Sequence, residues 1–256
     1  MSTTDVQTAI GRLVWHDHIS SDVDTAKSFY AELFGWTIET WKPGEMDYPM
    51  ISAGGKQHGG FGTAPAGVPP HWLGHVLVED ADETAAKAEA AGGRIVAPAM
   101  DIPEIGRMVV IADPQGAVFS AFASASPGEG SSAEGAFVWD ELLTTDVDGA
   151  KSFYGEIFGW TTTDMDVGES ETYTLFQRAG DVSTAGCMAK PADLPVPAAW
   201  ITYIGTDDVD ATTEKAPSLG ARVQVPPMDI PNDIGRFSVL IDPTGAAIGV
   251  FKGNPT

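Results

Sequence analysis

The sequence predicts an α+β protein built from four β-α-β-β-β modules that form two tandem domains. Its most informative feature is an internal repeat: residues 26–30 read Ala-Lys-Ser-Phe-Tyr, and residues 150–154 read the same, 124 positions later. Within each copy, the spacing of apolar residues changes from the period of two that is typical of strands to the helical period. Glycine and proline separate the segments. A repeat of this length indicates one folding unit that was duplicated and fused.

The first module begins with a strand, predicted over residues 13–19 because its side chains alternate between two environments. This register places Trp15 and Asp17 on one face. It places His16 and His18 on the opposite face, which we expect to pack against a helix.

The helix that follows is expected to begin at Asp22, a residue type that caps helix N-termini, and to end at Gly35, which tolerates the left-handed conformation. Its apolar positions at helical spacing are Ala26, Phe29, Tyr30 and Leu33. Short strands are then predicted over residues 36–41, 48–53 and 58–61.

The second module repeats this plan. Its first strand is predicted over residues 72–78, and Asp82 is expected to cap a helix that ends at Gly92. The remaining strands are predicted over residues 94–98, 107–112 and 117–122. The C-terminal half follows the same order, but Pro217 should shorten or kink its last helix because proline has no N–H to donate.

The repeat also defines the expected domains. An N-terminal domain should cover residues 10–122, and a C-terminal domain should cover residues 136–252. Residues 123–135, which read ASASPGEGSSAEG, have the composition of a flexible linker. Because two fused domains imitate a dimer of single-domain chains, we expect a monomer or a homodimer.

The composition excludes several classes of partner. With 14 Lys and Arg against 36 Asp and Glu, the net charge is −22, so the phosphates of a nucleic acid would be repelled. No apolar run reaches the length of a membrane span, and the polar N-terminus is not that of a signal peptide. The single cysteine, Cys187, forbids an internal disulfide and favours a reducing compartment, so we expect a cytoplasmic protein.

Several motifs recur in both halves: Asp-Val-Asp, Ala-Lys-Ser-Phe-Tyr, Phe-Gly-Trp, and Asp-Pro-x-Gly before the last strand. Their order resembles that of the vicinal oxygen chelate superfamily, which contains glyoxalase I, bleomycin-resistance proteins and extradiol dioxygenases. More narrowly, the chain looks like the tandem glyoxalase-like proteins of actinobacterial type. The resemblance implies two glyoxalase-like domains, in which curved mixed sheets surround a cavity and the helices lie outside.

The resemblance also raises the question of a metal. Metal-dependent members of the superfamily hold one divalent ion with four side chains, usually His and Glu, on the first and last strands of the modules. The matching positions here are Trp15, Gly60, Leu73 and Ser120 in the first half, and Trp139, Gly186, Ile201 and Gly249 in the second. These residues are poor ligands, so we expect no metal cofactor.

A divalent metal stays open as an alternative. If the register of the first strand were shifted by one residue, His16 and His18 would face the cavity. They could then hold an ion together with His58.

Two acidic residues belong to the candidate site. Asp17 and Glu141 each follow a tryptophan by two residues and should face the same cavity. A carboxylate there needs a backbone hydrogen bond or a salt bridge, for which Arg107 and Arg236 are candidates. The functional alternative is a general base or a polar anchor for a ligand.

His75 and Tyr203 occupy equivalent positions in the two halves. By pseudo-symmetry, His75 should approach Asp17, and Tyr203 should approach Glu141. An Asp17–His75 dyad could abstract a proton near neutral pH, because histidine titrates there. A buried histidine that is merely hydrogen-bonded would fit the same pattern.

Four functions follow from these observations. The favoured hypothesis is a protein that binds a small apolar or aromatic molecule in a Trp-lined cavity without metal. The alternatives are a metal-dependent lyase, isomerase or dioxygenase, a metal-free acid–base enzyme that uses Asp17 and His75, and an interaction protein with a relic cavity. The expected ligand-binding residues are Trp15, Trp72, Arg107, Trp139, Glu141, Trp200, Tyr203 and Arg236. For the four tryptophans, core packing is the competing explanation.

Overall fold

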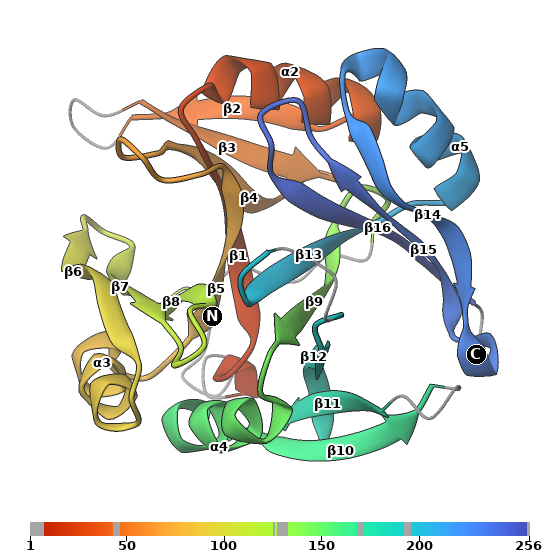
Figure 1. Ribbon diagram of the computed structural model, residues 1–256. Coiled ribbons are helices and arrows are strands. Elements are labelled where there is room, and N and C mark those ends of the chain that lie inside the picture. Colours follow the sequence, from red (N-terminus) through yellow and green to blue (C-terminus); the bar gives the residue numbers. More distant parts are fainter. Residues whose placement is uncertain are drawn as a thin grey trace. The chain divides into compact units, whose positions relative to one another are not determined.

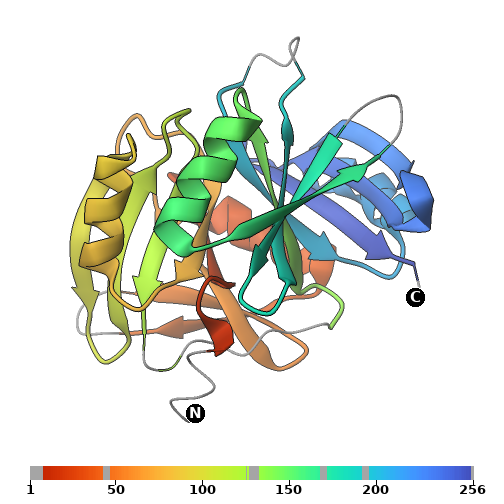
Figure 2. The same ribbon diagram turned by 90° about the horizontal axis from the view of Figure 1, so that it is seen from below.

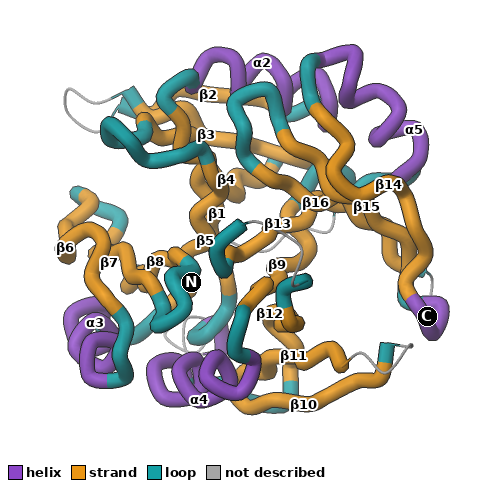
Figure 3. The backbone as a smooth tube through the Cα atoms, in the orientation of Figure 1, coloured by secondary structure: helices purple, strands orange, loops and turns teal. Residues whose placement is uncertain are grey.

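The computed structural model describes residues 8–42, 47–124, 126, 133–167, 172–191 and 196–254. In this part of the chain the structure has four α-helices and two eight-stranded mixed sheets (Figure 1; Figure 3). The predicted α+β class and the four β-α-β-β-β modules are therefore confirmed. None of the helices within these residues is long and apolar enough to cross a membrane.

The elements of the first half follow the predicted order. They are β1 (Leu13–Ser20), α2 (Val23–Phe34), β2 (Thr37–Trp41), β3 (Tyr48–Ala53), β4 (Lys56–Thr63), β5 (His71–Leu77), α3 (Ala81–Ala90), β6 (Arg94–Ile102), β7 (Gly106–Ala112) and β8 (Val118–Ala123). Most of the expected linker lies outside the described residues.

The second half repeats this series. Its elements are β9 (Phe137–Thr144), α4 (Val147–Phe158), β10 (Thr161–Asp166), β11 (Thr172–Arg178), β12 (Val182–Ala189), β13 (Ala199–Gly205), α5 (Val209–Lys215), β14 (Arg222–Ile230), β15 (Gly235–Ile241) and β16 (Ala247–Gly253).

Aspartate side chains cap the helices. Asp22 and Asp146 each accept a hydrogen bond from a backbone N–H of the first turn, at 3.1 and 2.9 Å. The sequence prediction was wrong for α3, which is capped by Asp80 rather than by Asp82. Asp82 lies in the first turn instead, and its carboxylate binds Arg107.

The helix ends agree with the sequence. Gly35 and Gly159 end α2 and α4 in the left-handed conformation, with φ of 69° and 68°. α5 has only seven residues before the chain tightens into a 3-10 helix over Ala216–Leu219, in which Pro217 occupies the first turn. The expected shortening at Pro217 is therefore confirmed.

The strand order is β2-β3-β4-β1-β5-β8-β7-β6 in the first sheet and β10-β11-β12-β9-β13-β16-β15-β14 in the second. Parallel pairing sets the register of the candidate site. It places Asp17 of β1 opposite Gly60 of β4, and His75 of β5 opposite Ser120 of β8. In the second sheet, Glu141 is paired with Gly186, and Tyr203 with Gly249.

The chain divides into two compact units that do not follow chain order. The second and third modules supply α3, β6 to β8, α4 and β10 to β12 to one unit, which we call the inner unit. The first and fourth modules supply α2, β2 to β4, α5 and β14 to β16 to the other, which we call the outer unit. The expected domains 10–122 and 136–252 stay a prediction about which segments fold independently.

Each unit has its own hydrophobic core. In the inner unit, α3 and α4 lie side by side (Figure 2), and Phe153 of α4 packs with Ile111 and Phe119 of the neighbouring strands. In the outer unit, Phe29 of α2 belongs to the same buried cluster as Leu240 of β15. Both of these clusters combine residues from the two halves of the sequence, whereas a smaller third cluster around Leu77 and Phe122 contains first-half residues.

Candidate functional site

The candidate site of the outer unit lies on one face of β1 to β4. Asp17 and Gly60 are paired across β1 and β4, so their side-chain positions share a face. The hydroxyl of Tyr48, on β3, donates a hydrogen bond to Asp17 Oδ1. The same hydroxyl lies where the Cβ of residue 60 would be, so only glycine fits there. The result is a fixed acid–tyrosine pair.

The inner unit repeats this arrangement with its own residues. Glu141 of β9 is paired with Gly186 of β12, as Asp17 is with Gly60. The Tyr173 hydroxyl fills the space where a Cβ of residue 186 would be. Both units therefore place an acid, a tyrosine and a glycine on one strand face.

Apolar side chains border the acid–tyrosine pair of the outer unit. Trp41 of β2 stands opposite Tyr48, with the two ring centroids 6.3 Å apart and the ring planes at 83°. Met50 stands opposite Gly60. All three side chains are partly exposed. In the inner unit, Met165 takes the position opposite Tyr173.

A further cross-strand pair, formed by His75 of β5 and Ser120 of β8, belongs to the inner unit. His75 and Ser120 are opposite each other and buried, and the His75 ring lies edge-on to Phe122 at 6.2 Å. Ser120 Oγ is fully buried and has no hydrogen-bond partner within the described part of the chain. Asp17 belongs to the outer unit and His75 to the inner one, so the proposed dyad stays a prediction.

Tyr203 takes a structural position within the outer unit. Its ring covers Gly249, where a Cβ would collide with it, and it contacts Phe237 edge-on at 6.3 Å. Trp15 and Trp139 are partly buried, and strand alternation puts them on the faces that carry Asp17 and Glu141. Their roles as ligand-binding residues stay predictions.

Two of the four predicted clamp tryptophans donate hydrogen bonds to core tyrosines. Trp72 is only 3% exposed, and its indole N–H donates to the Tyr30 hydroxyl at 2.9 Å. Trp200 is partly buried against the core of the inner unit and donates to the Tyr154 hydroxyl at 3.0 Å. These contacts favour core packing, most strongly for Trp72, and the ligand clamp stays a prediction.

These tyrosines connect each helix to an Asp-Pro-x-Gly turn. Tyr154 donates to Asp113 Oδ2 at 3.0 Å, and Tyr30 donates to Asp242 Oδ2 at 3.0 Å. Burial is the main cause that raises the pKa of both tyrosines, and the adjacent carboxylate adds to it. The tyrosine of α2 is thus hydrogen-bonded to the Asp-Pro-x-Gly turn of the second half, and the tyrosine of α4 to the turn of the first half.

The pKa values of Asp113 and Asp242 shift in opposite directions, and His18 is the main reason. Burial raises the pKa of Asp113 above its usual value, and backbone hydrogen bonds only partly oppose this. Burial acts in the same direction on Asp242, but hydrogen bonds from His18, at 2.7 Å, and Thr244 outweigh it and lower the pKa.

His16, His18 and His58 were the alternative metal ligands. His18 points into the core of the outer unit, whereas the rings of His16 and His58 both contact Phe137, at 4.2 and 4.7 Å. His58 is 7% exposed. Burial, assisted by the nearby His16, lowers the pKa of His58 to about 4. These histidines therefore occupy the helix side of β1 and its neighbours.

The donor set does not fit a chelated metal. A closed site needs three or more ligands, and no such group of His, Cys, Asp or Glu occurs among the residues that the structure describes. Gly60 and Gly186, opposite the two acids, offer no side chain, and tyrosine hydroxyls fill the space that a ligand would use.

The two candidate arginines, Arg107 and Arg236, each bind two carboxylates. Arg107 binds Asp82 at 2.6 Å and Asp101 at 2.8 Å. Arg236 repeats this with Asp210 at 2.7 Å and Asp229 at 2.8 Å. A salt bridge from either arginine to Asp17 or Glu141, and a role of the arginines in ligand binding, stay predictions. Two carboxylates on each guanidinium raise its pKa.

Sequence reasoning missed Tyr48, Tyr173 and Trp41. A signal was available: Tyr48 and Tyr173 recur at an offset of 125, on the strand that precedes Gly60 in one half and Gly186 in the other. Asp17 and Glu141 recur at an offset of 124. The offset of the tyrosines is one larger because the β10–β11 hairpin is one residue longer than the β2–β3 hairpin, and this difference concealed that Tyr48 and Tyr173 are equivalent.

Comparison with known proteins identifies the class. The family model of the Glyoxalase/Bleomycin resistance protein/Dioxygenase superfamily matches residues 12–120 and again residues 137–250. The chain belongs to this superfamily, as a tandem of two matching regions.

Relatives and solved structures agree with this assignment. The protein named "Putative glyoxylase CFP32" of Mycobacterium tuberculosis is 38% identical over 94% of both chains. The anthracycline biosynthesis protein DnrV of Streptomyces peucetius is 32% identical over 95% of this chain and 94% of its own.

Two solved structures share the fold at a TM-score of 0.66. The Mn(II)-bound glyoxalase of Novosphingobium aromaticivorans is 15% identical, with 95% of this chain and 82% of that chain covered. The 2,2',3-trihydroxybiphenyl 1,2-dioxygenase of Sphingomonas wittichii is 17% identical, with 96% and 91% covered.

Proposed function

We propose that this protein binds a small, flat aromatic molecule, neutral or cationic, without using a metal. The observation that carries the proposal is the Asp17–Tyr48 pair, which lies beside Trp41 on a partly exposed strand face. The recurrence of an acid, a tyrosine and a glycine in the inner unit supports a retained role for this arrangement.

The chemistry of the pair suits a polar anchor. A carboxylate can accept about four hydrogen bonds, so the bond from Tyr48 leaves Asp17 able to accept from a ligand N–H or O–H. Tyr48 also fixes the orientation of the carboxylate, which lowers the entropy cost of binding. Trp41 offers a stacking surface, and Met50 offers an adaptable apolar contact.

Charge and relatives support the ligand class. A net charge of −22 attracts cations and repels anions at a distance. The name of DnrV connects that relative with anthracyclines, which are polycyclic aromatic compounds. The name of CFP32 favours a glyoxylase instead, but the glyoxalase neighbour of known structure is a Mn(II) protein, and the donor set here does not fit chelation.

A pair of flat probes of opposite charge tests the proposal. We expect the cation 9-aminoacridine to quench the tryptophan fluorescence saturably, and 9-anthracenecarboxylate to bind at least tenfold more weakly. Asp17→Asn, which keeps the shape but removes the charge, should weaken 9-aminoacridine binding about tenfold, or about 1.4 kcal/mol. Tyr48→Phe and Trp41→Ala should each weaken it severalfold.

The control is Asp24→Asn, which removes a carboxylate from the exposed start of α2. It should bind 9-aminoacridine as the wild type does. Equal affinity of Asp17→Asn and wild type, or equal affinity for both probes, would refute the proposal.

A further inference from the structure

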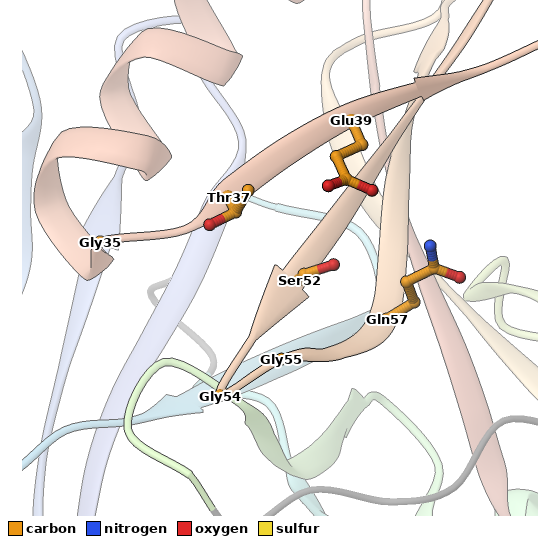
Figure 4. A pocket seen from close by; sticks show the side chains of 7 residues that line it. All are labelled: Gly35, Thr37, Glu39, Ser52, Gly54, Gly55 and Gln57. Atoms are coloured by element: carbon orange, nitrogen blue, oxygen red, sulfur yellow. The ribbon is translucent and has the colours of Figure 1, made fainter.

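A polar pocket lies at one end of the β2–β3–β4 sheet in the outer unit, on the strand face that also carries Trp41 and Tyr48. It is open to solvent and has a volume of about 400 Å³, which is within the range of small-molecule sites. Its lining residues are Gly35, Thr37, Glu39, Ser52, Gly54, Gly55 and Gln57. Figure 4 shows the side chains of Glu39, Ser52 and Gln57 turned toward the same space.

The pocket is electrically negative. Glu39 is the one charged residue among the described residues that line it. The lining also includes Gly35, the C-cap of α2. The partial negative charge of this helix end is offset by Lys215, whose ammonium donates a hydrogen bond to the Glu32 carbonyl in the last turn, so Glu39 is the source of the negative charge.

The equivalent place in the inner unit carries a longer side chain. Thr37 is paired with Ser52, and Ser52 with Gln57; in the inner unit the equivalent pairs join Thr161, Gln177 and Ser183. There the longer Gln177 side chain accepts a hydrogen bond from Thr163 at 2.8 Å, and it also donates to the Asp181 carbonyl at 3.4 Å.

Two substitutions therefore distinguish the copies. Ser52 leaves space that Gln177 fills, and Glu39 stands at the position of Thr163, which is uncharged. The two copies therefore differ at this place in charge and in the length of the side chain opposite the first residue of the edge strand.

We propose that this pocket binds a small organic ammonium compound that also carries hydroxyl groups. The ammonium would pair with Glu39, because charge-assisted hydrogen bonds are stronger than neutral ones. The hydroxyls would bond to Thr37, Ser52 and Gln57. The pocket adjoins the aromatic site, because Glu39 is paired with Met50, but it uses different residues and a different ligand class.

The test compares D-glucosamine with D-glucose, which have the same ring but differ by one ammonium group. Calorimetry and saturation-transfer NMR on the full chain should show glucosamine binding with a dissociation constant of about 1 mM. Glucose should bind at least tenfold more weakly. Glu39→Gln should weaken glucosamine about tenfold, and Ser52→Gln should abolish binding by filling the pocket as Gln177 does.

Gln177→Ser is the matched control and should leave glucosamine binding unchanged. Thermal melts establish that each variant is folded, and 9-aminoacridine binding should persist in Glu39→Gln and Ser52→Gln. Three results would overturn the inference: no saturable binding at tens of millimolar, equal binding of glucose and glucosamine, or undiminished binding in folded Ser52→Gln.

Discussion

At the residue scale, side chains that alternate along β1 have opposite roles. Asp17 lies on the face with Tyr48, whereas His16 and His18 face the buried aromatic residues around α2. The sequence predicted this alternation because a strand has a period of two. It could not predict Tyr48 as the partner of Asp17, since that contact depends on the hairpin between β2 and β3 and spans 31 positions.

The tight fit over Gly60 yields a first prediction. Gly60→Ala adds a Cβ where the Tyr48 hydroxyl lies, so we expect a loss of about 1–3 kcal/mol in the free energy of unfolding. Tyr48→Ala in the same chain should relieve the clash. A double-mutant cycle by denaturant titration measures the coupling, and strictly additive losses would contradict the packing.

The buried His58 yields a second prediction. Because its pKa is lowered to about 4 from an ordinary value near 6.5, the unfolded chain binds more protons between these values. Stability contributed by neutral His58 is therefore present above about pH 6.5 and lost as the pH falls toward 4. The expected loss is about 3 kcal/mol in order of magnitude.

His58→Phe tests this, because phenylalanine can keep the edge contacts with Trp36 and Phe137 but does not titrate. Unfolding free energies measured by urea titration should fall less steeply for the variant between pH 6.5 and pH 4. The same slope in both proteins would show that His58 is not the group responsible.

At the element scale, helices were easier to predict than strands. Asp22, Gly35 and Pro217 are local signals, and all three act as expected. Strand ends were less accurate: β4 extends beyond the predicted 58–61 at both ends, next to an irregularity at Ile51 and Ser52. A bulge depends on the partner strand, so the sequence of one strand does not reveal it.

The caps yield a third prediction. Asp146→Ala removes the acceptor for the Gly149 N–H and should cost about 1 kcal/mol. Asp148→Ala, in the first turn of the same helix, removes only a favourable charge and should cost less. Thermal melts of both variants measure the difference, and an equal or reversed effect would contradict the assignment of Asp146 as the cap.

At the scale of the whole molecule, the modules share cores across the two halves. The repeat predicted four modules, but it could not predict that the first is joined with the fourth and the second with the third. Identical repeats offer several pairings, and only long-range contacts such as Tyr154 with Asp113 select one. The same limitation left the sequence unable to choose between core packing and a ligand clamp for Trp72 and Trp200.

This arrangement yields a fourth prediction. Residues 1–124 and residues 133–256, produced separately, should not fold as monomers because each lacks the partner modules of its cores. We expect each fragment to self-associate or stay poorly folded, and an equimolar mixture to form a one-to-one complex. Light scattering and near-UV circular dichroism report this. A cooperatively folded monomeric half would contradict it.

The most direct test of the proposed function is a calorimetric titration of 9-aminoacridine into protein treated with EDTA. If the acid–tyrosine pair binds aromatic ligands without a metal, the dissociation constant should be unchanged by EDTA and should rise about tenfold in Asp17→Asn. Binding that disappears with EDTA and returns with one equivalent of a divalent ion would contradict the account.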